Sequence, residues 1–424
     1  MSAFLYFLAM AFTIPVLPKI VNEIIGKGQV TAKSATVYGL LTSVDASFTL
    51  LTVNFHGTLS DLLGRRPFFA LSSLGLGIGF TLTSLAKNLW MLVLAAAIDG
   101  CTSCMYSIAQ ASVTDCVGEG QDAKLSEAFG VFQGLALGCA FMIGLPLGGV
   151  LGATKGYRFS MSVSVVLCAL NVLMVGVFMP ESLPKSRRKK EVDLSLANPL
   201  GAIKMASRNN LISGVTVVWM LLWIAHCGMQ INWINYTEVK FGWSMAQSGA
   251  SLAVLGALVA VVPKLIIPRL GMERSISFGL LVYAMSQVLI GVAPGQSSEQ
   301  ARLGAAVLMA GIVLTAVGTV VFPATLAYLN HQVAANEKGA LQGAADTAKT
   351  LCSAIGSPSM AWVFGFFMSE RAWPRQVTGA NYYVGACIAL VAWAYSLSTF
   401  NNHGHESLHV EPEDAAFDFE AFEP

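Results

Sequence analysis

Charged side chains are scarce in this chain of 424 residues. They make up 12% of the sequence, whereas hydrophobic residues make up 55%; an ordinary soluble domain carries about 25% charged residues. Apolar runs of about 20 residues, enough to cross about 30 Å of hydrocarbon, recur along nearly the whole sequence with short polar breaks between them. The composition therefore excludes a soluble globular domain and indicates an all-α membrane protein.

Sequence patterns for several other functions are also lacking. The eight cysteines form neither a paired framework nor a zinc-ligand spacing, so we expect them to be small packing residues. No Walker motif, nucleophile elbow or metalloprotease helix occurs, and we expect no enzyme activity, cofactor or metal. Lys and Arg number 25 against 24 Asp and Glu, which gives no reason to expect a nucleic-acid partner. The first span begins at once, without a basic region or cleavage site, so we expect no signal peptide and a very short or truncated amino terminus.

Twelve apolar windows are long enough to span a membrane. They lie near residues 2–21, 37–60, 67–86, 89–113, 127–152, 158–180, 210–234, 247–268, 274–294, 303–329, 341–367 and 379–400. The most polar internal stretch divides them six and six and carries seven Lys and Arg residues. The sequence predicts an N-terminal six-helix bundle (1–183), a cytoplasmic linker (184–210), a C-terminal six-helix bundle (211–400) and a disordered acidic tail (401–424).

Basic residues predict the orientation, because loops rich in Lys and Arg tend to stay cytoplasmic. With both termini inside, 15 of the 25 Lys and Arg residues fall on the cytoplasmic side, Lys349 among them, and much of this bias comes from the linker. We therefore expect both termini to be cytoplasmic. No retrieval or targeting signal distinguishes the plasma membrane from an intracellular compartment.

The most specific pattern in the sequence follows the second predicted span and reads GTLSDLLGRRP. Gly57 permits close approach of a neighbouring helix, Gly64 permits a tight turn, and Asp61 with Arg65 and Arg66 forms a charged group at the membrane surface. A basic turn between two spans would explain the arginines but not the order of all five residues. A related segment, PRLGMER, follows the eighth span, which indicates a faint internal repeat of six spans.

This pattern resembles the signature of the major facilitator superfamily, and within it the tetracycline-resistance and hippocampus-abundant-transcript-like branch of drug:proton antiporters. Further segments share the resemblance: Ile14–Pro18, which we expect to close the first span, Met179–Pro184, Phe322–Ala324 and Glu337–Gly343. The resemblance covers nearly the whole chain. It implies twelve transmembrane helices in two six-helix bundles, with a solute site at mid-membrane lined by spans one, four, seven and ten. It also implies that the charged group around Asp61 locks the two halves together on the cytoplasmic side in one state.

The chain departs from the family pattern at three places. Leu62 stands where the family has a basic residue, and Ala96 stands where a fourth-span arginine is often linked to proton transfer. The fifth-span motif of the antiporters is shifted, with its proline displaced by one. Its hinge residues, which we expect to act in gating, are Gly144, Pro146, Gly148 and Gly149. Proton coupling therefore requires other groups in this chain.

Polar and aromatic residues recur at helical spacing within three predicted spans, which places each set on one helix face. They are Asp99, Ser103, Tyr106 and Gln110 in the fourth span; Trp219, Trp223, His226, Gln230 and Trp233 in the seventh; and Asp45, Thr49, Thr52 and His56 in the second. Gln133 of the fifth span is a further candidate. Since the resemblance implies that the fourth and seventh spans line the cavity, these residues are our candidates for the solute and proton pathway.

Each candidate also has a structural interpretation. Hydroxyl groups commonly bond the preceding helical turn, the tryptophans suit packing or the membrane interface, and an interior histidine is often simply hydrogen-bonded. Carboxylates differ, because a charge near the bilayer centre costs about 3 kcal/mol on insertion scales. We expect Asp99 to be the proton site and place Asp45 nearer the outer surface. The alternative is that Asp99 is neutral, or paired with Tyr106 or His226, and only holds helices together.

The leading function is secondary transport of a small organic solute by a monomer in the lipid bilayer, with protons as the candidate coupling ion. Aromatic residues beside few fixed charges favour an amphipathic or weakly charged solute. The lack of an arginine in the predicted cavity argues against a multiply charged anion. Two alternatives stay open: an uncoupled facilitative carrier, motivated by Ala96, and a non-transporting receptor or scaffold with the same fold.

Overall fold

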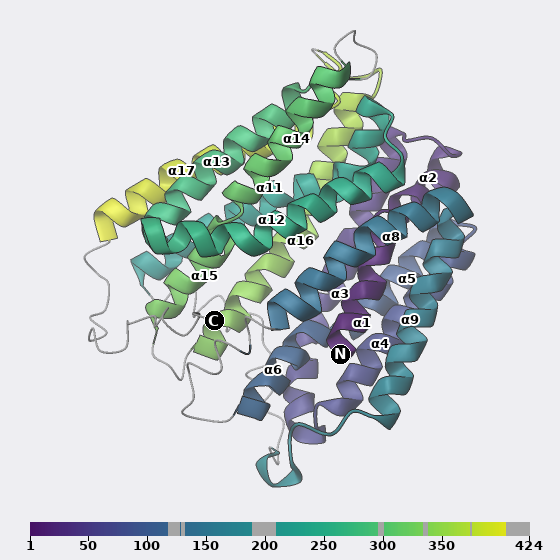
Figure 1. Cartoon of the computed structure of the whole chain (residues 1–424), viewed down its shortest axis with the longest axis vertical. Helices are drawn as coiled ribbons and strands as arrows, with labels where there is room; N and C mark the ends of the chain where they lie inside the picture. The colour runs from purple at the N-terminus through teal and green to yellow at the C-terminus, as the bar shows by residue number, and fades with distance from the viewer. Residues whose placement is uncertain are drawn as a thin grey trace.

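The structure is a computed structural model that describes residues 1–117, 128, 132–188, 209–295, 301–333, 338–373 and 375–403. Regular structure in these residues is helical throughout, and twelve helices or helix pairs are long and apolar enough to cross a membrane (Figure 1). The predicted fold class and the count of twelve spans are therefore confirmed. Most of the predicted linker, residues 189–208, and the tail from residue 404 lie outside the described residues.

The first six spans use nine helical segments. These are α1 (Ser2–Thr13) with α2 (Leu17–Gly26), α3 (Ala32–Leu63), α4 (Arg66–Leu85), α5 (Leu89–Thr102) with α6 (Met105–Val117), the π-helical η1 (Phe132–Gly138) with α8 (Cys139–Lys155), and α9 (Tyr157–Val177). A short 3₁₀ turn, η2 (Lys185–Arg187), follows. The last six spans are α11 (Asn210–Phe241), α12 (Met245–Leu270), α13 (Met272–Val292), α14 (Ala301–Gly318) with α15 (Val321–His331), α16 (Lys338–Met368) and α17 (Ala380–His403).

Side-chain caps set where several of these helices begin. The Thr31 hydroxyl accepts from the backbone N–H of Ser34 at 3.1 Å, and the Ser34 hydroxyl accepts in return from Thr31 N–H, which starts α3 with a capping box. The Asn209 side-chain oxygen accepts from the backbone N–H of Ile212 and caps α11, which ends at Gly242, whose φ of 65° lies in the left-handed region. Local chemistry thus determines the ends of these spans.

Three spans are interrupted near their middles. The first breaks between α1 and α2 around Pro15, the fourth between α5 and α6 at Ser103, and the tenth between α14 and α15 just before Pro323. Proline lacks the N–H that a continuous helix requires, whereas the fourth-span break has another cause. There the Ser72 hydroxyl of α4 donates to Thr102 O at 2.9 Å and accepts from Cys104 N–H at 3.3 Å. Backbone groups freed by the break are therefore partnered.

The segment Ile14–Pro18 corrects one prediction. It was expected to close the first span, but the apolar helix pair continues from Ser2 to Gly26. The prolines bend the span at mid-membrane instead of ending it, because α2 resumes at Leu17 with Pro18 in its first turn, where no intrahelical N–H bond is lost.

The two halves of the chain meet along two helix pairs, α3 with α16 and α8 with α12 (Figure 1). Glycines permit the contact: a Cβ at Gly39 would lie 2.8 Å from Ser357 O, and a Cβ at Gly149 would lie 2.5 Å from Met245 O. These contacts involve the first turns of α3 and α12 and the last turns of α8. Following the orientation predicted from the sequence, we call this end of the bundle, which carries Gly26 and Phe241, the outer end, and the opposite end, which carries Asp61, the inner end.

Candidate functional site

Two carboxylates of the first half lie together at mid-membrane. Gly100 packs directly on the backbone of Asp45, because a Cβ at Gly100 would collide with Asp45 O, and this contact brings Asp99 of α5 beside Asp45 of α3. Asp45 and Asp99 interact electrostatically, and one carboxyl oxygen of Asp45 is buried without a hydrogen-bond partner in the described structure. We call these two residues the acid pair. Asp45 was expected nearer the outer surface; the glycine contact places it level with Asp99.

Several polar groups surround the acid pair. They are the Tyr6 hydroxyl from α1 and the Cys168 thiol; Tyr6 in turn hydrogen-bonds Ser103 at the helix break and lies near the Cys104 thiol. Sequence analysis missed Tyr6, because its side chain reaches the pair from a different span. None of these neighbours is basic, so the acid pair has no cation among them to balance its charge.

Aromatic side chains of the second half form a compact cluster. The rings of Trp219, Trp223 and His226 on α11 pack around Phe322 at the start of α15, with centroids 4.8 to 5.7 Å apart. Edge-to-face contacts of this length stabilise ring clusters. His226 Nδ1 lies 3.1 Å from the Tyr283 hydroxyl. We call the four rings on α11 and α15 the aromatic cluster.

Lys349 of α16 extends into the space between the two halves. Its amine lies 4.8 Å from the ring centroid of Trp223, in the second half, and 5.8 Å from that of Tyr106, in the first. Our sequence analysis counted Lys349 with a cytoplasmic loop. That was wrong, because the residue lies inside the membrane span Gly343–Met368. The sequence does contain a pattern that predicts an intramembrane lysine, because Asp346 and Lys349 stand three residues apart within an otherwise apolar window.

The predicted stripe on the fourth span is divided by the helix break. Ser103 belongs to the surroundings of the acid pair, whereas Tyr106 packs against the rings of Phe7 and Phe132 and faces Lys349. The regular spacing does not hold across the non-helical residues at 103 and 104, so the four residues do not form one continuous face. Gln110 lies half-buried one turn further along α6.

The remaining predicted polar residues have different surroundings. Gln230 is exposed on α11, and the Gln133 side chain lies outside the described residues. Trp233 is buried, and its indole N–H is within 3.3 Å of Ser248 O and 3.1 Å of the Ser251 hydroxyl, which is a packing role. On α3, Thr49 and Thr52 donate to Gly100 O instead of facing a cavity.

The charged group of Asp61, Arg65 and Arg66 was predicted to lie in the loop after the second span, but part of it lies within a helix. Helix α3 continues to Leu63, so Gly57 and Asp61 are helical, and the turn consists of Gly64, at a φ of 102°, and Arg65. The positive φ favours glycine at position 64.

Arg65 is 7% exposed, and its guanidinium is the centre of an ion-pair network. It lies 2.7 Å from Asp61 and 2.9 Å from Asp115 of α6. The carboxylate of Glu181 accepts from the backbone N–H groups of Arg65 and Arg66, and the Arg66 side chain donates to Val175 O at 3.0 Å. All these partners belong to the first half. The resemblance implied a lock between the halves, whereas the ion pairs named here, all between described residues, lie within the first half.

The hinge residues of α8 allow close helix contact on both sides. Gly144 and Gly148 pack on Ala11 and Phe12 of α1, whereas Gly149 packs on Met245 of the other half. Pro146 lies within the helix between them. A side chain at any of the three glycine positions would collide with a neighbour, so this surface depends on glycine.

Two polar contacts join the halves at the outer end. Lys19 of α2 forms an ion pair with Glu238 of α11, and the Asn22 amide donates to Asn235 Oδ1 at 2.9 Å. Sequence analysis missed both, since residues more than 200 positions apart give no local signal. We call these four residues the outer contact.

Exchange of charge tests the outer contact. Lys19→Glu alone is expected to favour the state open at the outer end, because two carboxylates would then repel each other across the seam. Accessibility of a cysteine placed at Asn235 to a membrane-impermeant maleimide should rise several-fold. The double variant Lys19→Glu with Glu238→Lys should restore wild-type labelling; equal labelling in all three proteins would show that the ion pair does not hold this end closed.

Asp61→Asn tests the inner network. The amide keeps a hydrogen-bonding oxygen but removes one of two negative charges on Arg65, so we expect expression near normal and a several-fold lower transport rate. Initial rates of solute exchange in proteoliposomes provide the measurement. Wild-type kinetics in this variant would rule out a role for Asp61 in the transport cycle.

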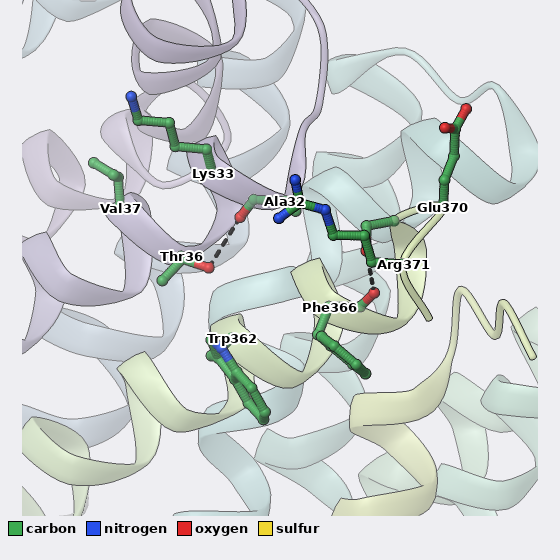
Figure 2. A pocket seen from close by; sticks show the side chains of 9 residues that line it. Ala32, Lys33, Thr36, Val37, Trp362, Phe366, Glu370 and Arg371 are labelled. Carbon is green, nitrogen blue, oxygen red and sulfur yellow. Dashed lines mark hydrogen bonds between the residues drawn. The ribbon is translucent and has the colours of Figure 1, made fainter. Parts of the chain in front are cut away.

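A separate cavity of about 570 Å³ lies where α3 meets α16 near the outer end. Figure 2 shows Lys33 and Thr36 of α3 on one side and Trp362, Phe366 and Arg371 on the other. None of the acid pair, the aromatic cluster or Lys349 lines it. The cavity is therefore distinct from the candidate pathway.

Comparisons with known proteins agree with this geometry. A family model described as Major Facilitator Superfamily matches residues 1–357. Tetracycline resistance protein, class G, of Vibrio anguillarum is 27% identical over 91% of this chain and 92% of that protein, and hippocampus abundant transcript-like protein 1 of Homo sapiens is 22% identical over 85% and 72%.

Solved structures share the fold. Nucleoside transporter NupG superposes with a TM-score of 0.70 at 11% identity, covering 94% of this chain and 97% of that one. The human organic anion transporter MFSD10 (TETRAN) superposes with a TM-score of 0.63 at 20% identity, covering 93% and 97%. The resemblance drawn from the sequence is confirmed, and the chain belongs to the major facilitator superfamily of multi-pass, non-enzymatic membrane transporters.

Proposed function

We propose that this protein carries a small amphipathic organic solute across a membrane by alternating access, coupled to protons at the acid pair. One observation carries the proposal: groups from both halves face a single amine inside a membrane span, with Tyr106 on one side of Lys349 and Trp223 on the other. A solute held between the halves would contact both, and rocking of residues 1–183 against 211–400 would expose it to each side in turn.

The acid pair supports proton coupling. Two neighbouring carboxylates without a cation repel each other when both are ionised, so a proton shared by Asp45 and Asp99 relieves that repulsion. Their neighbours Tyr6 and Cys168 add no positive charge, and neither do Ser103 and Cys104 beside Tyr6. A proton that enters or leaves with water changes the relative stability of two conformations, and it thereby acts as a ligand for one of them.

The aromatic cluster supports a solute with an apolar or planar part. Its rings offer faces and edges to such a molecule, and the buried Trp223 indole N–H has no hydrogen-bond partner in the described structure, so it is available as a donor. The bacterial relatives are named for resistance to tetracycline, an organic molecule, which agrees with a solute of this kind.

A two-step experiment tests the proposal. Purified protein is first screened for thermal stabilisation by a library of organic solutes, because a ligand stabilises the state that it binds. Each stabilising solute is then tested in proteoliposomes for counterflow and for accumulation driven by a pH gradient. Accumulation that disappears when the gradient is collapsed is expected. Accumulation unchanged by collapse would indicate the uncoupled carrier, and no movement of any bound solute would indicate a receptor or scaffold.

A further inference from the structure

Lys349 is a cation at membrane depth that has no ion pair in the described part of the chain. The ion pairs there involve Lys19, Arg65, Arg158 and Arg188, but no carboxylate lies within 4.0 Å of the Lys349 amine. Ionisable residues within transmembrane segments are costly and usually face a cavity or serve a function. The partners of this amine are instead two aromatic faces, one from each half.

Asp346 is the nearest candidate for a structural counter-ion. It lies three residues before Lys349 on α16, half-buried, and the two interact electrostatically without forming an ion pair. His226 of the aromatic cluster also interacts with the amine. The amine itself is directed at the seam between the halves, with a ring from each half beside it.

We propose that the transported solute is a singly charged organic anion with a planar ring, and that Lys349 binds its acidic group. This inference rests on the proposed transport function and names its substrate class. An anion would supply the ion pair that Lys349 lacks, while its ring would pack beside Trp223 and Phe322. One amine matches one negative charge. Because Tyr106 belongs to the other half, closure of the halves would complete the site around the bound molecule.

Four small probes separate the contributions of charge and ring. They are 2-naphthoate, its neutral amide 2-naphthamide, the cation 2-naphthylmethylammonium, and the ringless anion butyrate. Binding of each radiolabelled probe to detergent-purified protein is measured by equilibrium dialysis, and counterflow of each is measured in proteoliposomes. Wild-type protein should bind 2-naphthoate at least tenfold more tightly than any of the other three.

Variants at one position assign the effect to Lys349. Lys349→Gln should bind 2-naphthoate and 2-naphthamide with an affinity ratio of about 1, which is no preference, whereas Lys349→Arg should retain the preference for 2-naphthoate. Lys264→Gln is the matched control, because Lys264 is exposed on α12 of the same half and should leave the preference unchanged. Thermal unfolding distinguishes binding from a structural role. Removal of an unpaired cation should not lower the melting temperature, whereas loss of a structural partner for Asp346 would.

The possible outcomes are distinct. Equal preference for 2-naphthoate in wild-type and Lys349→Gln protein, preference for the amide or the cation, or no binding of any probe at millimolar concentration would overturn the anion assignment. Counterflow of the amide or the cation would leave transport intact while overturning this inference. No counterflow of any solute that stabilises the protein would instead overturn the transport function itself.

Discussion

Arg65→Gln is expected to destabilise the protein more than any other single change considered above. Arg65 is 7% exposed, its guanidinium lies within 2.9 Å of both Asp61 and Asp115, and the Ser60 hydroxyl also accepts from it. Glutamine cannot balance two carboxylates. Removal of one partner from a buried ion pair costs about 3–5 kcal/mol, and we expect about 3 kcal/mol here because the two aspartates are partly exposed.

This effect is measured as a melting temperature in detergent. The readout is the loss of monodisperse protein as the temperature rises. Arg274→Gln is the matched control, because Arg274 lies in the first turn of α13, in the equivalent segment of the second half, is exposed and forms no ion pair with a described residue. A melting temperature for Arg65→Gln equal to that of the control would contradict the view that the network holds the inner end of the first half together.

Asp99→Asn is expected to abolish solute accumulation driven by a pH gradient while exchange of solute continues. The amide has nearly the shape of the carboxylic acid but cannot release a proton, and it ends the repulsion with Asp45. The variant therefore resembles the permanently protonated protein. It should still bind solute and rock between states, but the proton gradient would no longer drive the cycle in one direction.

Accumulation and counterflow in the same proteoliposomes, at several external pH values, separate these effects. Glu370→Gln makes the same chemical change at an exposed site near the outer end and should behave as wild type. If Asp99→Asn accumulates solute as well as wild type does, Asp99 is not the proton site, and the pair serves only to hold α3 against α5.

The twelve spans were predictable from sequence because their length and apolarity are local properties. The interruptions were not. At Ser103 the helix breaks, and the Ser72 hydroxyl of a neighbouring span bonds two of the freed backbone groups. No pattern within residues 89–117 predicts this break. The prolines at 15 and 18 gave a visible signal, but it was assigned to the end of a span because a break at mid-membrane and a terminus share the same residues.

The candidate site was only partly predictable for a related reason. Trp219, Trp223 and His226 follow helical spacing on the uninterrupted α11, so their shared face was predictable, whereas Phe322 joins them from another span. Lys349 was assigned to a cytoplasmic loop because it is basic, although it lies within an apolar window. Tyr6 and the outer contact depend on which spans are neighbours, and that information comes from packing rather than from any single segment.

Helix α11 differs from the first, fourth and tenth spans in being uninterrupted. Its 32 residues form one rod, about 48 Å long at 1.5 Å per residue. Glu238 of the outer contact and Trp219 of the aromatic cluster are attached to the same rod, more than five turns apart. A bend can absorb movement in the broken spans, but a rigid rod acts as a lever. We therefore expect separation of Lys19 from Glu238 to shift Trp219 and Trp223 as well, so that the outer contact and the aromatic cluster are coupled through a single helix.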